Sequence, residues 1–98
     1  MTYDLIIRGA TVASAADSFI ADIAVADGRI AAVGGLSAPA RQVLEARGLI
    51  AIPGGIDAHT HFAMPWRGGA TADDFLTGTT AALFGGTTTV IDAAVQSK

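Results

Sequence analysis

The chemistry in this chain is concentrated in two histidines, His59 and His61, which stand two positions apart. Alternate residues of a β-strand project from the same face, so both imidazoles would point to one side of a strand. A pair of imidazoles supplies two of the ligands that zinc and related metals take from proteins. The chain has no other histidine and no cysteine, so the sequence predicts about half of a metal site.

Each of four other residues near this pair has two possible roles. Asp57 shares the strand face of His59 and either orients an imidazole or accepts hydrogen bonds from backbone amides. Asp92 follows a later apolar strand and either faces the site or caps the next element, with the structural role favoured. Met64 and Trp66 follow the pair in a loop and either line a substrate pocket or pack against the first half of the chain.

The first half of the chain has the pattern of short strands separated by turns. The expected strands are residues 3–7, 11–13, 19–26, 29–33, 42–46 and 49–52. Asp27-Gly28 is a hairpin signal, because a type I′ turn needs positive φ at both central positions. This spacing predicts a small antiparallel sheet or half a sandwich over residues 1–52.

From residue 53 the pattern changes to strand, helix and strand. Residues 54–61 are an apolar strand that runs into a loop, and residues 87–91 are a β-branched strand expected to be buried on both faces. Strands joined through a helix in one sheet pair in parallel. Residues 53–98 therefore predict the start of a larger parallel α/β fold.

The helix between these strands has signals at both ends. Thr71 is expected to cap it, with Asp73 and Asp74 in the first turn, where carboxylates are favoured by the helix dipole. Gly85 and Gly86 end it, as glycine commonly does just past a helix. One helical face is expected to combine Phe75, Gly78, Thr79, Ala82 and Leu83.

Composition limits the classes of protein. Apolar residues make up 51% of the chain and charged residues 15%, against about 25% charged in an ordinary domain. The longest uncharged stretch, residues 75–91, contains six threonines and three glycines, which argues against a membrane span. Asp4 and Arg8 interrupt the early apolar run, unlike a signal peptide. A net charge of −3 argues against nucleic acid, and the lack of cysteine fits a cytoplasmic protein.

Several segments resemble a known family. Residues 49–62, Leu-Ile-Ala-Ile-Pro-Gly-Gly-Ile-Asp-Ala-His-Thr-His-Phe, resemble the opening of a cyclic amidohydrolase. Residues 72–79 and 81–92 resemble the dihydropyrimidinase and hydantoinase branch. Residues 3–10 and 23–30 are similar to the N-terminal β-sandwich strands of this superfamily. The motifs are specific for the superfamily but less so for the branch, since allantoinases and dihydroorotases share much of the pattern.

The resemblance implies an α/β fold with a TIM barrel beside a β-sandwich built from both chain ends, the barrel being incomplete here. It implies two divalent metals, usually zinc, with His59 and His61 on the more buried one. A bridging carboxylated lysine, two more histidines and a proton-transferring aspartate are expected beyond residue 98. Lys98 is not assigned the bridging role, so no catalytic residue is assigned in this chain.

The resemblance also implies a substrate and an assembly. The reaction is the opening of dihydropyrimidine or hydantoin rings to N-carbamoyl amino acids, in pyrimidine catabolism, by a homotetramer. Arg67 lies further along its loop than the arginine with which related branches read a carboxylate, which favours an uncharged cyclic ureide. The alternatives are an allantoinase- or dihydroorotase-like amidase, or a non-catalytic relative used for assembly. Retention of both histidines argues against the last.

The length of the chain sets a further expectation. A TIM barrel takes roughly 250 residues, and this chain has 98. Met1 stands where the family begins, so we expect a genuine start and a cut end, from either a longer reading frame or a truncated product. The isolated chain is expected to lack hydrolase activity, because two ligands bind zinc poorly and exposed strand edges promote aggregation.

Overall fold

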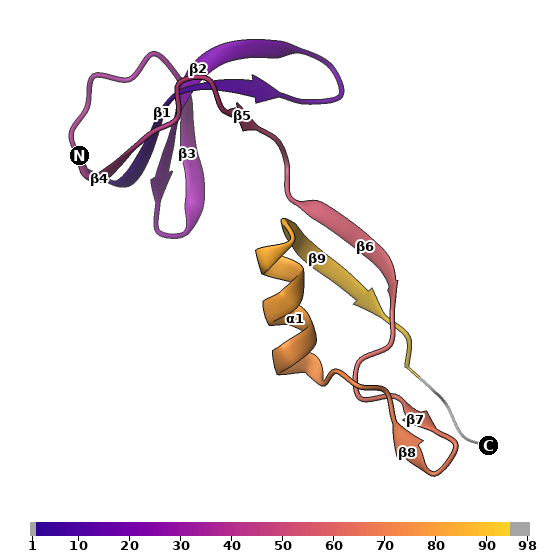
Figure 1. Ribbon diagram of the computed structural model, residues 1–98. Helices are drawn as coiled ribbons and strands as arrows, with labels where there is room; N and C mark the ends of the chain where they lie inside the picture. Colours follow the sequence, from indigo (N-terminus) through magenta and orange to yellow (C-terminus); the bar gives the residue numbers. More distant parts are fainter. Residues whose placement is uncertain (1, 95–98) are drawn as a thin grey trace. The chain divides into compact units, whose positions relative to one another are not determined.

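The computed structural model describes residues 2–94, which form mostly strands with one helix (Figure 1). Lys98 lies outside the described residues. The chain divides into two compact units, residues 1–53 and 54–98, each with its own internal contacts. The helix of the described part is too short to cross a membrane.

The first unit is a five-stranded mixed sheet. Its strands are β1 (Tyr3–Ala13), β2 (Ser18–Ala26), β3 (Arg29–Gly34), β4 (Ala40–Glu45) and β5 (Ile50–Ala51). The central strand β1 pairs antiparallel with β2, which pairs antiparallel with β3. On its other side β1 pairs in parallel with β4 and β5. The expectation of an antiparallel sheet was therefore wrong in part. Strands β2 and β3 lie between β1 and β4 in the chain, and this long connection allows β4 to return parallel to β1.

Strand β1 is continuous where the sequence predicted two strands separated by a turn. The register with β2 shifts between Ile7 and Ala10, and Gly9 has φ of 70°. A glycine at positive φ inside a ladder is typical of a β-bulge, which bends a strand without ending it. The Asp22 carboxylate fastens the bulge, accepting hydrogen bonds from the Gly9 amide at 2.9 Å and the Leu36 amide at 3.2 Å.

These hydrogen bonds predict an acid-sensitive link in the first unit. The Gly9 amide, and then the Leu36 amide, hold the pKa of Asp22 below its ordinary value of 3.8. A carboxyl with a lowered folded pKa stabilises the fold above its unfolded pKa and loses that contribution as the pH falls through the folded pKa. We expect Asp22→Asn to lower the unfolding midpoint at neutral pH and to flatten its fall below pH of about 4.

Thermal unfolding between neutral and acid pH would measure this effect. Asp27→Asn is the matched control, because its exposed side chain makes no hydrogen bond among the described residues and asparagine tolerates its positive φ. Identical pH dependence in Asp22→Asn and in the unaltered protein would contradict the prediction.

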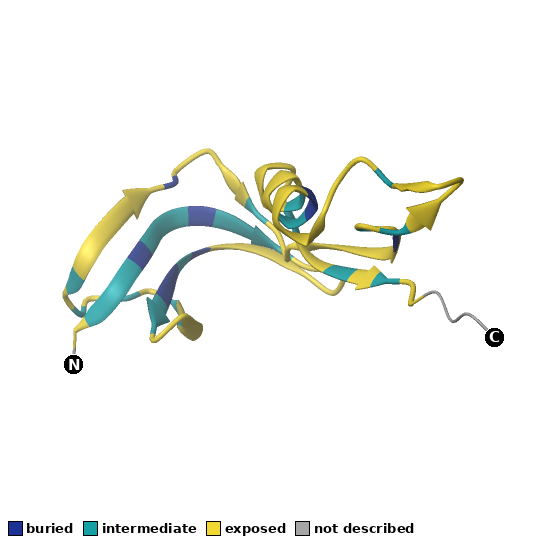
Figure 2. Cartoon of the chain, turned by 90° about the horizontal axis from the view of Figure 1, so that it is seen from below, coloured by how far each residue is buried: buried dark blue, intermediate teal, exposed yellow. Residues whose placement is uncertain are grey.

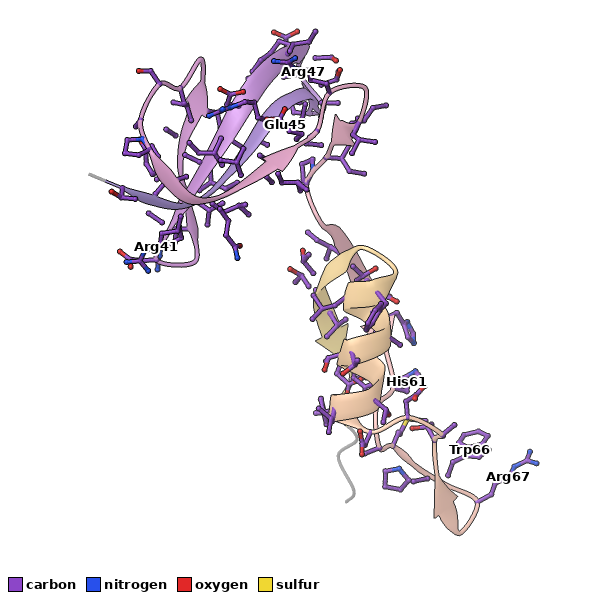
Figure 3. The ribbon with its side chains drawn as sticks, turned by 60° about the vertical axis from the view of Figure 1, so that its left-hand side comes forward. Arg41, Glu45, Arg47, His61, Trp66 and Arg67 are labelled. Atoms are coloured by element: carbon purple, nitrogen blue, oxygen red, sulfur yellow. The ribbon has the colours of Figure 1, made fainter. Side chains whose placement is uncertain are left out.

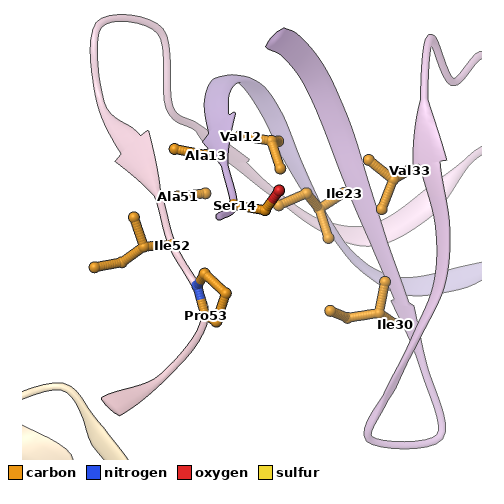
Figure 4. Close-up of a pocket in the computed structure, with 9 residues that line it drawn as sticks. All are labelled: Val12, Ala13, Ser14, Ile23, Ile30, Val33, Ala51, Ile52 and Pro53. Atoms are coloured by element: carbon orange, nitrogen blue, oxygen red, sulfur yellow. The ribbon is translucent and has the colours of Figure 1, made fainter. Parts of the chain in front are cut away.

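The buried core of the first unit is small and lies on β1, β2 and the end of β4 (Figure 2). Ile6 is its only large side chain that is fully buried. An apolar hollow of about 220 Å³, drawn in Figure 4, lies beside this core at Ile23. It is lined by Val12, Ala13, Ser14, Ile23, Ile30, Val33, Ala51, Ile52 and Pro53. Ile30 and Ile52 remain 69% and 72% exposed, so the described residues leave apolar surface of this sheet uncovered.

The second unit is a β-α-β unit with a hairpin inserted. Strands β6 (Gly55–Thr60) and β9 (Thr87–Asp92) pair in parallel, as the sequence predicted, and α1 (Phe75–Phe84) connects them. The hairpin of β7 (Pro65–Trp66) and β8 (Gly69–Ala70) was predicted only as loop. Its turn residues Arg67 and Gly68 have φ of 45° and 83°, as in a type I′ turn. Arginine is unusual there, so the sequence signal was weak.

Helix α1 begins later than predicted. Asp74, not Thr71, is its N-cap, and no acidic residue lies in the first turn. The Asp74 carboxylate accepts from the Thr77 amide at 2.8 Å, and the Asp74 amide donates to Thr77 Oγ1 at 3.1 Å. This is a capping box, in which the residue three positions after the cap returns a hydrogen bond. The sequence signal for this start was the Asp74-x-x-Thr77 spacing. The predicted end of the helix at Gly85 is confirmed.

The second unit covers its strands on one side only. Gly78 is the one buried residue of α1, whereas Phe75 and Leu83 of the predicted inner face are exposed. Strand β9 is not buried on both faces as expected, since Ile91 is 55% exposed. The reason is that the described residues supply a single helix to a two-stranded sheet, and buried parallel strands need cover on both faces.

Candidate metal centre

The structure brings the two imidazoles together at the carboxyl end of β6. His59 lies in the strand and His61 one residue beyond it, and both are exposed. Their Nε2 atoms are 2.9 Å apart, and the ring planes meet at 82°. Figure 3 labels His61 at this end of the unit. The nitrogens that would donate to a metal therefore face each other.

The spacing of these nitrogens suits a shared metal ion. With metal–nitrogen distances of about 2.0–2.1 Å, two ligands at a right angle lie about 2.9 Å apart and two tetrahedral ligands about 3.3 Å apart. The observed 2.9 Å matches the first and needs only a small opening for the second. Among the described residues no cluster of three or more metal-binding side chains occurs, so the pair accounts for two ligand positions.

Asp57 contacts the backbone and not a ring. Its carboxylate accepts a hydrogen bond from the His59 amide at 3.1 Å. Of the two readings of this residue, the structure shows the backbone acceptor. By fixing the amide of His59, it still restricts the strand segment that carries the first imidazole.

Asp92 reaches back from β9 to the histidine segment. Its Oδ1 accepts from Thr60 Oγ1 and from the Phe62 amide, both at 2.9 Å. Thr60 is the buried member of β6 and is the register partner of Asp92. The carboxylate therefore ties together the ends of the two parallel strands, a structural role that differs from the expected cap of the next element.

Thr71 is a residue of the site that the sequence reasoning missed. It was expected to cap the helix, but its Oγ1 donates to the His61 carbonyl at 2.7 Å and accepts from the Met64 amide at 3.0 Å. The Thr71 amide also donates to the Met64 carbonyl at 2.9 Å. These bonds close the loop that follows His61. Nothing local in the sequence distinguishes this role from a cap.

The two proposed pocket residues differ in position. Met64 lines a groove of about 420 Å³ together with Phe62, Phe75 and Asp92. Trp66 is not among the residues that line this groove, and it is 60% exposed in the hairpin. The guanidinium of Arg67 lies 5.5 Å from its ring centroid, and both are labelled in Figure 3. Of the two proposed pocket residues, Met64 lines the groove and Trp66 does not.

Phe62 packs against the helix at a glycine. A Cβ at Gly78 would overlap the Phe62 ring. The same ring meets Phe75 edge-on, with centroids 5.6 Å apart and planes at 70°. Because Phe62 follows His61 directly, this contact fixes the loop on which the second imidazole stands.

Comparisons with known proteins agree with the sequence motifs. The model of the amidohydrolase family matches residues 50–97. A D-hydantoinase of Streptomyces coelicolor is 46% identical over 99% of this chain and 22% of its own length. The chain belongs to the amidohydrolase family. The resemblance to the hydantoinase and dihydropyrimidinase branch is thereby confirmed.

Other relatives point to the same branch and to its neighbour. A dihydropyrimidinase of Rattus norvegicus is 43% identical over 96% of this chain and 19% of its own length. An allantoinase of Escherichia coli is 45% identical over 94% of this chain and 20% of its own length. The solved D-hydantoinase of Bacillus sp. AR9 superposes with a TM-score of 0.91 at 48% identity, over 97% of this chain and 21% of that one. The amidohydrolase chain described here spans about a fifth of the length of these relatives.

Proposed function

We propose that the protein to which this chain belongs is a metal-dependent cyclic amidohydrolase that opens dihydropyrimidine or hydantoin rings to N-carbamoyl amino acids. The observation that carries the proposal is the convergence of the His59 and His61 Nε2 atoms at 2.9 Å. It is supported by relatives that are D-hydantoinases and dihydropyrimidinases. Residues 1–52 are then part of a β-sandwich, and residues 53–98 are the first strand, helix and second strand of a TIM barrel. Active sites of such barrels lie at the carboxyl ends of the strands, where this pair stands.

The chain's own residues would hold and orient the ligands. To hold a metal, His59 and His61 would each present a free lone pair at Nε2, with the ring proton at Nδ1. Asp57 and Thr71 fix the backbone of the two histidines through the His59 amide and the His61 carbonyl. Met64 and Phe62 line an apolar groove in the loop that follows His61. Bound divalent metals, zinc foremost, would supply an activated water and polarise the ring carbonyl.

The remaining parts of the proposal concern the whole protein. In the proposal, a bridging lysine, two further histidines and a proton-transferring aspartate complete the site from other parts of the whole protein. The resemblance supports a homotetramer acting in pyrimidine catabolism in the cytoplasm. An allantoinase activity is the second candidate, because an allantoinase is as similar to this chain as several hydantoinases are.

A substrate panel tests the proposal. The full-length protein, loaded with zinc, would be offered dihydrouracil, hydantoin, allantoin and dihydroorotate, and ring opening would be followed by absorbance. We expect turnover of the first two and removal of that turnover by a chelator. Preference for allantoin would establish the second candidate, and metal binding without turnover of any ring would indicate a non-catalytic assembly protein.

The isolated 98-residue chain is expected to be inactive toward the same substrates. Two imidazoles make an incomplete ligand set. Several apolar side chains of the described residues are exposed, and Ile52 is 72% exposed. Such exposed apolar surface favours aggregation. Metal-dependent ring opening by the purified chain would overturn this prediction, and size-exclusion chromatography would report its association.

A further inference from the structure

A single carboxylate oxygen holds the residues on both sides of His61. Asp92 Oδ1 accepts from Thr60 Oγ1 and from the Phe62 amide, each at 2.9 Å. Thr60 is only 9% exposed, and Asp92 is half-buried. The second imidazole therefore stands on a backbone segment that is fixed before and after it.

This fixation adds to the backbone pairing at the end of the strand, where the Thr60 carbonyl accepts from the Ala93 amide at 3.2 Å. Strand β6 ends at Thr60, and the register with β9 shifts between Asp57 and Thr60. Beyond the end of a strand, a residue without hydrogen bonds keeps its backbone freedom. The opposite side of the segment is held by Thr71 Oγ1, which donates to the His61 carbonyl. The segment that carries His61 is thus held by side-chain hydrogen bonds where the pairing of β6 with β9 ends.

We propose that Asp92 is the positioning residue of the His59–His61 pair and keeps the two Nε2 atoms converged before a metal binds. It acts through Thr60 and Phe62, and no hydrogen bond joins its carboxylate to either ring among the described residues. In its reference to a metal, this inference rests on the proposed function. The positioning itself is a property of the protein alone and can be measured without metal.

The test compares variants of the full-length protein. Asp92→Ala removes the acceptor, whereas Asp92→Asn keeps an oxygen that can accept both hydrogen bonds. Asp73→Ala is the matched control, because its exposed carboxylate has no hydrogen bond in the described part of the chain. Two readouts are needed: hydrogen exchange of the peptide 57–62 in metal-free protein, and affinity and absorption spectrum with Co²⁺.

Removal of the acceptor should loosen the segment and weaken metal binding. We expect Asp92→Ala to accelerate exchange of the 57–62 peptide, to alter the Co²⁺ spectrum and to weaken metal affinity by about 10–100-fold, the loss typical of residues that orient ligands. Asp92→Asn should restore most of both readouts, and Asp73→Ala should match the unaltered protein. Should Asp92→Ala fail to fold, Thr60→Val removes one of the two donors and should give the same changes at smaller size.

Two results would overturn the inference. One is unaltered exchange and affinity in Asp92→Ala. The other is an Asp92→Asn variant as impaired as Asp92→Ala, because the role would then belong to the negative charge and not to the held donors. Failure of the unaltered protein to bind metal would instead refute the proposed function, and the exchange data alone would then decide whether Asp92 positions the segment.

Discussion

Replacing His59 or His61 by asparagine in the full-length protein is expected to abolish tight metal binding and ring opening. Each variant removes one of two imidazole nitrogens that lie 2.9 Å apart. A catalytic metal both activates water and stabilises the developing oxyanion. Loss of a single oxyanion donor alone costs about 10²–10³ in rate, so we expect kcat/KM to fall by at least about 10³-fold.

Metal content and kcat/KM should fall together in both histidine variants. Metal analysis of the purified proteins would be paired with steady-state kinetics on the preferred substrate. Asp73→Asn serves as the control, since Asp73 lies before the helix cap and away from the pair in the chain. Full metal content and activity in either histidine variant would remove that residue from the site.

Gly78→Ala is expected to destabilise the second unit although alanine favours helices. The added Cβ would overlap the Phe62 ring. Alanine in place of a helical glycine gains about 1 kcal/mol, whereas overpacking costs typically about 1–3 kcal/mol. We expect a net loss of up to about 2 kcal/mol in the free energy of unfolding. Metal affinity should fall as well, because Phe62 cannot move without its neighbour His61.

Chemical denaturation of the full-length protein would measure the loss of stability. Gly85→Ala is a matched control at the end of the same helix, where φ is −86° and the nearest atom to a new Cβ lies at 3.5 Å. Combining Gly78→Ala with Phe62→Ala should cost less than the sum of the two, since the smaller side chain removes the overlap. Additive losses would show that the glycine is not there to admit the Phe62 ring.

The Asp27-Gly28 turn, the β-α-β unit and the histidine pair could be predicted from the sequence because their signals are local. The Asp27-Gly28 turn has positive φ at both residues, 50° and 70°, as its two residue types predict. The parallel pairing of β6 and β9 follows from strand, helix and strand in succession. The convergence of His59 and His61 follows from a spacing of two at a strand end. Each inference needs only residues within one element or one connection.

The contacts that join distant positions of the chain could be seen only in the tertiary structure. The Asp22 bond to Gly9 spans 13 positions, the Thr71 bond to His61 spans 10, and the Asp92 bond to Thr60 spans 32. From the local sequence alone, Asp, Thr and Gly are equally compatible with a helix cap, a turn or the end of a strand. Their roles here depend on which strand ends the sheet register places side by side. The sequence by itself therefore determined that the two histidines lie together, and the fold determined what holds them in place.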